Sequence, residues 1–211
     1  IHRPALPDDL KSQIPIVKDV VSYLGLELIE KSGFEADDVI ASLCADSIKE
    51  GLEVFIVSSD KDLYQLLSNK NAAIYNYHKD KVIRRDDFMD EFGFEPKLIV
   101  DYLALCGDPS DNIPGAKGIG KVGASKLIKE FGSIENIFSN LNNLSPKMQA
   151  IISNSKSDIV MSKDLATLAV PKLKYKLEDL EISQVDTDSL YEVFTDMEFK
   201  TLLKDLPAPS F

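Results

Sequence analysis

Hydrophobic residues recur along the first half of the chain in two patterns, one typical of helices and one typical of strands. Apolar residues at helical spacing predict helices over residues 8–25, 35–50, 61–67 and 85–92. Short β-rich runs predict strands over residues 26–32 and 53–59, and two strands or a hairpin over residues 72–85. Strands that alternate with helices in this way indicate an α/β layer fold with a parallel sheet.

From about Pro96 the pattern is mainly helical. Helices are expected over residues 96–107, 123–132 and 133–141, with one or two more over residues 145–169. A strand over residues 172–182 and a closing helix over residues 187–206 complete the chain. We place a domain boundary near Leu105, which gives an α/β domain, residues 1–105, and a helical region, residues 106–211.

Composition narrows the class of protein. The chain is 44% hydrophobic, which is enough to bury a core. No apolar run approaches the roughly 20 residues of a membrane span, so we expect a cytoplasmic protein with no membrane partner. We also expect a monomer. Two cysteines and two histidines, far apart in the sequence, do not form a zinc motif, so any metal should be held by oxygen atoms.

Carboxylates gather in three short groups. Glu35, Asp37 and Asp38 open a predicted helix, Asp60 and Asp62 directly follow a predicted strand, and Asp108 and Asp111 flank a turn. Each group has a structural alternative, because acids also complement helix dipoles, cap helices and form Asx turns.

Taken together, the three groups predict a metal site. Ligands bind beyond the carboxyl ends of parallel strands, which is where Asp60 and Asp62 lie in the sequence. Carboxylates this dense repel one another and need a compensating cation. Oxygen ligands favour Mg²⁺ or Mn²⁺, and two such ions could activate a water and stabilise the leaving oxygen in phosphodiester hydrolysis.

The glycine-rich stretch "GDPSDNIPGAKGIGKVGASKLI" nearly matches two phosphate-binding motifs. A dinucleotide site would need a strand before Gly118, and a P-loop would need Ser or Thr where Val122 stands. A third interpretation is a helix–loop–helix clamp, in which glycine amides and a helix N-terminus bind a nucleic-acid phosphate. A plain helix connection with solvated lysines remains the fourth alternative.

Charge distribution favours the clamp. The net charge of −11, taken alone, argues against a nucleic-acid binder. Between Lys117 and Lys129, however, there are four lysines and no acid. The residues that we expect to contact DNA are Gly115, Lys117, Gly118, Gly120, Lys121, Ser125 and Lys126.

Three ordered motifs, "GFEADDVIASL", "VSSDKDLYQLL" and the glycine-rich stretch, resemble the 5′-nuclease (5′→3′ exonuclease) domain of bacterial DNA polymerase I, within the flap endonuclease superfamily. The resemblance covers essentially the whole chain, and the opening "HRPALPDDL" resembles the segment after that family's helical arch. It implies a PIN-like α/β domain followed by a helix-three-turn-helix (helix-hairpin-helix-like) DNA-binding domain.

The resemblance also implies a function. The family cuts 5′ flaps and RNA primers in duplex DNA during replication and repair, using two divalent ions, often with K⁺ at the DNA-binding hairpin. All seven carboxylates named above match family metal ligands, and a polymerase domain follows in the intact relatives. In the family, a first strand that carries an Asp ligand and the helical arch come before the segment that this chain resembles from Ile1 onward. We therefore expect an N-terminally truncated form. The alternative function is a non-catalytic DNA-binding module.

Overall fold

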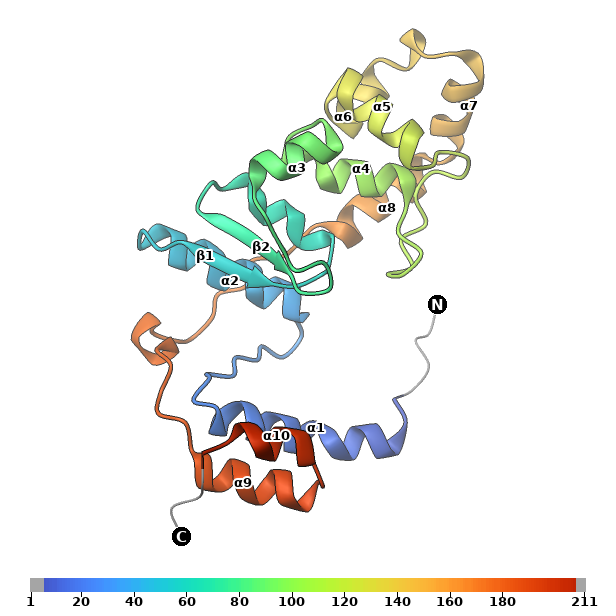
Figure 1. Cartoon of the computed structure of the whole chain (residues 1–211). Coiled ribbons are helices and arrows are strands. Elements are labelled where there is room, and N and C mark those ends of the chain that lie inside the picture. The colour runs from blue at the N-terminus through green and yellow to red at the C-terminus, as the bar shows by residue number, and fades with distance from the viewer. Residues whose placement is uncertain (1–5, 208–211) are drawn as a thin grey trace. The chain divides into compact units, whose positions relative to one another are not determined.

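The computed structural model describes residues 6–207, and residues 1–5 of the Pro-rich opening lie outside the described residues. The chain forms two compact units, one of Ser32–Lys172 and one of Ile1–Lys31 with Leu173–Phe211 (Figure 1). Within the described part, no helix is long and apolar enough to cross a membrane.

The larger unit begins with alternating helices and strands and continues as helices. Its α/β part contains α2 (Ala36–Lys49), β1 (Val54–Val57), η1 (Asp62–Ser68), β2 (Ala72–Asn76), β3 (Lys81–Ile83) and α3 (Arg85–Phe92). Its helical part contains η2 (Pro96–Leu98), α4 (Ile99–Cys106), α5 (Lys121–Phe131), α6 (Ile134–Ser139), η3 (Leu141–Asn143), α7 (Pro146–Asn154) and α8 (Lys156–Ala166).

The sheet of this unit has three strands in the order β1-β2-β3. β1 and β2 are parallel, with Val54 opposite Ala72, and β2 and β3 form an antiparallel hairpin. The predicted parallel pair and the predicted hairpin are therefore confirmed. Because β1 and β2 run in the same direction, the segments after Val57 and after Asn76 leave the sheet at the same edge.

A single hydrophobic core extends from the sheet into the helical part. Ile74 on β2, Phe88 on α3 and Leu103 on α4 are 2% exposed or less. Aromatic rings add directional contacts, with the Phe88 and Phe92 rings stacked 4.4 Å apart between centroids. Burial of each such side chain contributes about 1.5–3 kcal/mol. The core continues through Leu105, and the domain boundary near that residue stays a prediction.

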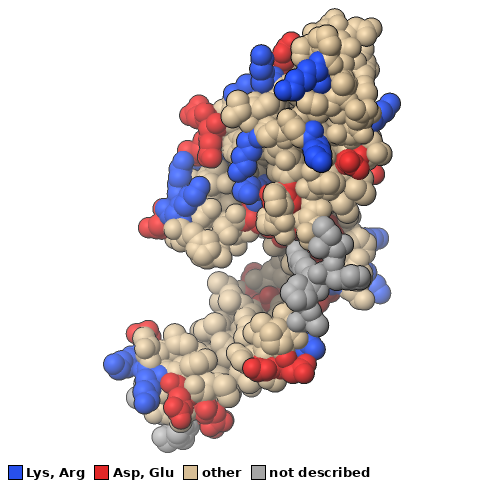
Figure 2. Space-filling view, turned by 90° about the vertical axis from the view of Figure 1, so that its right-hand side faces the viewer, with Lys and Arg blue, Asp and Glu red and all other residues tan. Residues whose placement is uncertain are grey.

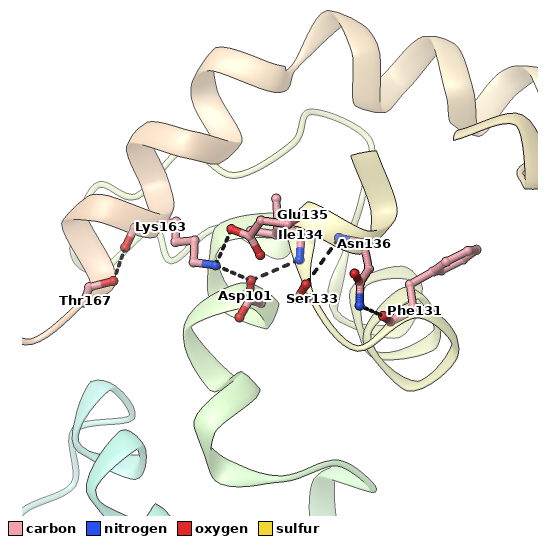
Figure 3. A network of polar contacts seen from close by, with 8 residues as sticks. All are labelled: Asp101, Phe131, Ser133, Ile134, Glu135, Asn136, Lys163 and Thr167. Carbon is pink, nitrogen blue, oxygen red and sulfur yellow. Dashed lines mark hydrogen bonds and ion pairs between the residues drawn. The ribbon is translucent and has the colours of Figure 1, made fainter. Parts of the chain in front are cut away.

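Three helices of the larger unit are joined by a network of polar contacts around the buried Asp101 (Figure 3). The ammonium of Lys163 on α8 lies 2.7 Å from the Asp101 carboxylate on α4 and 2.8 Å from the Glu135 carboxylate on α6. Asp101 also accepts a hydrogen bond of 3.1 Å from the backbone N–H of Ile134, at the start of α6. Since Asp101 is only 5% exposed, these partners compensate the cost of burying its charge.

The smaller unit is helical. It contains α1 (Asp8–Tyr23), η4 (Leu177–Leu180), α9 (Thr187–Asp196) and α10 (Lys200–Asp205). The two segments of the unit are joined by backbone hydrogen bonds, from Ser183 N to Gly25 O at 2.9 Å and from Asp186 N to Tyr23 O at 2.8 Å.

Several secondary-structure predictions need correction. Residues 26–32 and 172–182 form no strand, and neither segment pairs with any of the three strands of the described chain. In the second segment the Asp179 carboxylate instead accepts from Lys176 N at 3.0 Å and η4 forms. The short helix expected over residues 61–67 is the 3₁₀ helix η1, and the first turn of the helix expected from Pro96 is the 3₁₀ turn η2. The closing helix is broken where Glu198 adopts a left-handed φ of 56°.

Candidate functional site

The second carboxylate group lies at the carboxyl edge of the sheet, as its position after β1 predicts. Asp60 comes three residues after the last residue of β1, and one of its carboxylate oxygens accepts from the N–H of Asp62 at 3.0 Å. This bond begins the 3₁₀ helix η1 and holds both acids at the strand end. Both side chains are half-buried.

The first group lies at the start of α2, where its three acids have different surroundings. Glu35 is exposed and Asp37 is half-buried. The Asp38 carboxylate accepts from Glu35 N at 3.2 Å and from Ala169 N at 2.8 Å. Asp38 therefore links the segment after α8 to the start of α2 by a hydrogen bond. This structural role of Asp38 comes in addition to its predicted role as a metal ligand.

The third group lies in a tight loop after α4. Asp108 and Ile113 pair through two backbone hydrogen bonds of 3.0 and 2.9 Å, which close the loop. The Asp108 carboxylate accepts from the N–H and the hydroxyl of Ser110, and it is 6% exposed. Asp111 lies half-buried in the same loop.

Electrostatics show that the three groups come together. Burial and then the charge of Asp60 raise the pKa of Asp37, with a smaller effect of Asp111. Burial raises the pKa of Asp62 to about 7, and repulsion from Asp60 and Asp111 adds to the effect. Side chains from α2, the β1 edge and the loop after α4 thus share one negative field.

One cation within the protein partly compensates this field. Lys61 Nζ lies 3.3 Å from the Asp108 carboxylate. Burial opposes ionisation of Asp108, but hydrogen bonds from Ser110 and the charge of Lys61 outweigh it and lower its pKa. The sequence analysis missed Lys61, although its place between two of the acids in "SSDKD" marks it as the nearest cation.

The carboxylates offer the right chemistry for a hard divalent ion but no completed shell. Every candidate ligand is an oxygen donor, and repulsion from the neighbouring carboxylates adds to the burial that raises the pKa of Asp62. Across residues 6–207, no three His, Cys, Asp or Glu side chains are already arranged around one ion position. A bound cation would therefore have to draw the side chains inward.

A cavity of about 400 Å³ opens beside these acids. Its walls include Asp60, Lys61, Asp108 and Asp111, together with Tyr77 from the turn after β2. A second hollow of about 220 Å³ shares Lys61 and Asp108 with the first and adds Lys79 and Lys121. Lysines thus line the way from the acids toward α5.

The glycine-rich loop connects α4 to α5, and no strand precedes it, so the dinucleotide interpretation is wrong. At its start two segments of the backbone pass close to each other. A Cβ atom on Gly115 would lie 2.3 Å from the backbone N of Gly107. The N–H of Gly115 donates to the buried hydroxyl of Ser162 at 3.0 Å. Gly115 is therefore a packing residue whose amide is engaged inside the protein, and its predicted DNA contact stays a prediction.

The rest of the loop is open to solvent. Gly118 and Gly120 are exposed, and α5 begins at Lys121 with Gly120 as its N-cap. No acid lies in the first turn of α5, whose leading amides have no partner inside the helix. Lys117, Lys121 and Lys126 are exposed, and Ser125 is half-buried. In Figure 2, Lys and Arg side chains are spread over the visible face of the larger unit, with a few acids among them.

An acid-rich edge at the carboxyl ends of two parallel strands, together with a helix–loop–helix element, fits the class of a nuclease with an α/β domain and a helical domain. Sequence models agree with this class. The model of the 5′-3′ exonuclease N-terminal resolvase-like domain matches residues 1–93, and that of the 5′-3′ exonuclease C-terminal SAM fold matches residues 94–188. The chain belongs to the 5′-3′ exonuclease family.

Individual relatives support the assignment. A 5′-3′ exonuclease of Aquifex aeolicus is 38% identical over 97% of this chain and 70% of its own length. DNA polymerase I of Caldicellulosiruptor bescii is 36% identical over 97% of this chain, which spans 25% of that polymerase. Among solved structures, a bacteriophage T5 flap endonuclease in a complex with DNA and metal ions has a TM-score of 0.63 at 22% identity, covering 76% of this chain and 58% of that one. That likeness shows the fold.

The raised pKa of Asp62 predicts a pH-dependent stability. In the unfolded chain an Asp titrates near pH 4, whereas Asp62 in the folded protein titrates at about 7. Its contribution to stability is therefore present below pH 4 and is lost as the pH rises through 7. We expect Asp62→Asn to raise the free energy of unfolding at pH 8 by about 1 to 2 kcal/mol, a value reduced for solvent screening, and by much less at pH 4.

Urea unfolding at pH 4, 6 and 8 without divalent ions measures this difference. Asp90→Asn, at an exposed position on α3, serves as the control and should change stability by less than about 0.5 kcal/mol at each pH. A gain for Asp62→Asn that is the same at pH 4 and pH 8 would contradict the assignment.

Proposed function

We propose that this chain is the nuclease part of a divalent-metal-dependent, structure-specific 5′-nuclease that cuts DNA flaps and RNA primers during replication and repair. The observation that carries the proposal is the shared negative field of Asp37, Asp60, Asp62 and Asp111, which come from three separate segments. Acids brought together from distant segments at a strand edge are costly for folding and so favour a functional explanation.

Mg²⁺ or Mn²⁺ would be held by Asp60, Asp62 and Asp111, with further ligands from Asp37, Asp108, Glu35 and Asp38. When bound, two such ions supply activation of a water and stabilisation of the leaving oxygen. Lys61 keeps Asp108 ionised, and the hydrogen bonds of Ser110 orient that carboxylate toward one geometry. No side-chain nucleophile is needed for this chemistry.

DNA binding is assigned to the loop from Gly115 to Gly120 and to the first two turns of α5. The amides of the exposed residues Gly118 and Gly120 would donate to a backbone phosphate, with K⁺ as a bridging ion. Exposed Lys117, Lys121 and Lys126 supply charge that does not depend on sequence, and Ser125 adds a hydroxyl. We further propose a cytoplasmic monomer, joined to a polymerase domain in the intact protein, as in the polymerase relatives.

Cleavage of a 5′-flap substrate tests the proposed activity directly. In the full-length protein with Mg²⁺ or Mn²⁺, Asp60→Asn and Asp111→Asn should each lower the cleavage rate about a hundredfold or more, because each removes an acid from the cation-binding field. Thermal stability should not fall, since each substitution also relieves repulsion.

Asp164→Asn, at an exposed position on α8, is the matched control and should cut at the unchanged rate. Undiminished cutting by Asp60→Asn and Asp111→Asn would contradict the proposed site. Flap binding without any cutting by the unaltered protein would instead favour the non-catalytic DNA-binding module.

The proposed clamp predicts a change in salt dependence. Replacing Lys117 and Lys121 together by Ala should weaken duplex binding and reduce the slope of log affinity against log salt by about 1.8, or about 0.9 for each lost phosphate contact. The double variant of Lys49 and Lys70, both exposed near the opposite edge of the sheet, should keep the slope. Fluorescence anisotropy at several salt concentrations measures both, and an unchanged slope in the first variant would exclude these lysines as phosphate contacts.

A further inference from the structure

A single aromatic side chain lies on the wall of the acid-lined cavity. Tyr77 is the first residue after β2, at the same edge of the sheet where Asp60 follows β1. The cavity of about 400 Å³ is lined by both residues and by Asp108 and Asp111. The other lining residues are polar except Val57, and Tyr77 is 53% exposed.

The turn that carries Tyr77 is held in place by its own hydrogen bonds. Lys79 N donates to Asn76 O at 3.2 Å and to the Asn76 side-chain oxygen at 3.1 Å, and Asn76 is buried. The Tyr75 hydroxyl donates to the Asp80 carboxylate at 2.7 Å. A fixed turn presents an aromatic ring at little cost in conformational entropy.

The ring of Tyr77 also has an aromatic neighbour. Its centroid lies 4.1 Å from that of His78, with the ring planes tilted by 43°. One side of the tyrosine is thereby supported by an imidazole, while half of the side chain stays open to solvent. Aromatic side chains placed in this way serve as platforms on which bases stack.

Positive charge lies next to the ring. Lys79, two residues along the same turn, lines the adjoining hollow of about 220 Å³ together with Lys61 and Lys121. An aromatic ring beside one cavity and an ammonium beside the next fit a nucleotide unit, whose base is flat and apolar and whose phosphate is anionic.

We propose that Tyr77 is a base-stacking residue for a nucleic-acid strand that passes the carboxylates, and that Lys79 binds a phosphate of the same strand. The ligand is an unpaired or unstacked nucleobase, because a paired base inside a duplex does not offer its face. This inference rests on the proposed nuclease function for the identity of the ligand. It adds a contact to a base, whereas the proposed clamp and metal ions contact only phosphate groups.

A cycle that combines a protein substitution with an abasic site tests the inference. Binding is measured with the full-length protein and a flap duplex that phosphorothioate linkages at the junction protect from cutting. In a series of such duplexes, a single abasic site replaces one nucleotide after another on either side of the junction. At one position the unaltered protein should bind the abasic DNA about tenfold more weakly than the intact DNA.

Tyr77→Ala should bind intact DNA about tenfold more weakly and should not respond to the abasic site at that position. Tyr77→Phe, which keeps the ring, should behave as the unaltered protein. Phe55→Ala, which removes a ring that is 50% exposed on β1, should keep the abasic effect. The proposal would be overturned if Tyr77→Ala did not weaken binding. It would also be overturned if the loss of affinity from Tyr77→Ala and the loss from the abasic site were additive at every position.

The two proposals fail separately. If the unaltered protein does not cut a normal flap with Mg²⁺ or Mn²⁺ but the cycle shows coupling at Tyr77, the nuclease function fails and the base contact stands. If cutting occurs and no position shows coupling, the base contact fails and the nuclease function stands.

Discussion

The close crossing of the backbone at Gly107 and Gly115 is the constraint on which both halves of the proposed site depend. The chain leaves α4 at Gly107, makes the tight loop that carries Asp108 and Asp111, and returns to Gly115 with no room for a side chain between the two strands of backbone. Ala116 N then donates to Leu105 O at 2.8 Å, which holds the returning chain against the end of α4. One crossing therefore places Asp108 and Asp111 before it in the chain and the loop proposed to bind phosphate after it.

Helix α8 fixes this crossing to the rest of the larger unit. Ser162 binds the amide of Gly115, and its neighbour Lys163 binds Asp101 on α4. Just beyond, the Gln65 side chain donates to Ala166 O and to Asp62 O, at 2.8 Å in both cases. Ser162 of α8 thus binds the loop proposed to contact DNA, and Ala166 at the end of α8 is joined through Gln65 to the backbone of Asp62, one of the proposed metal ligands. This explains in physical terms how binding of a duplex could be kept in register with the acids.

Much of the site could be predicted from sequence because its residues lie at positions that the local pattern marks. Asp60 and Asp62 follow a β-rich run, and Asp37 opens an amphipathic helix, so both groups were expected at element ends. Local pattern could not show that Asp38 accepts a hydrogen bond from the amide of Ala169, 131 residues away. Nor could it show that the amide of Gly115 donates to the hydroxyl of Ser162, 47 residues away. The strand expected over residues 26–32 failed for a related reason, since alternation shows that a segment suits a sheet but not that a partner strand is present.

The central claim is that one backbone crossing positions both the cation-binding acids and the DNA-binding loop. Gly115→Ala tests it most directly, because the new methyl group would collide with the backbone of Gly107 and the left-handed φ of 62° would be strained. The measurement is the affinity of this variant for Mn²⁺ and for a flap duplex, with the melting transition recorded to confirm a folded protein. We expect both affinities to fall together. A folded variant that loses one affinity and keeps the other would contradict the claim.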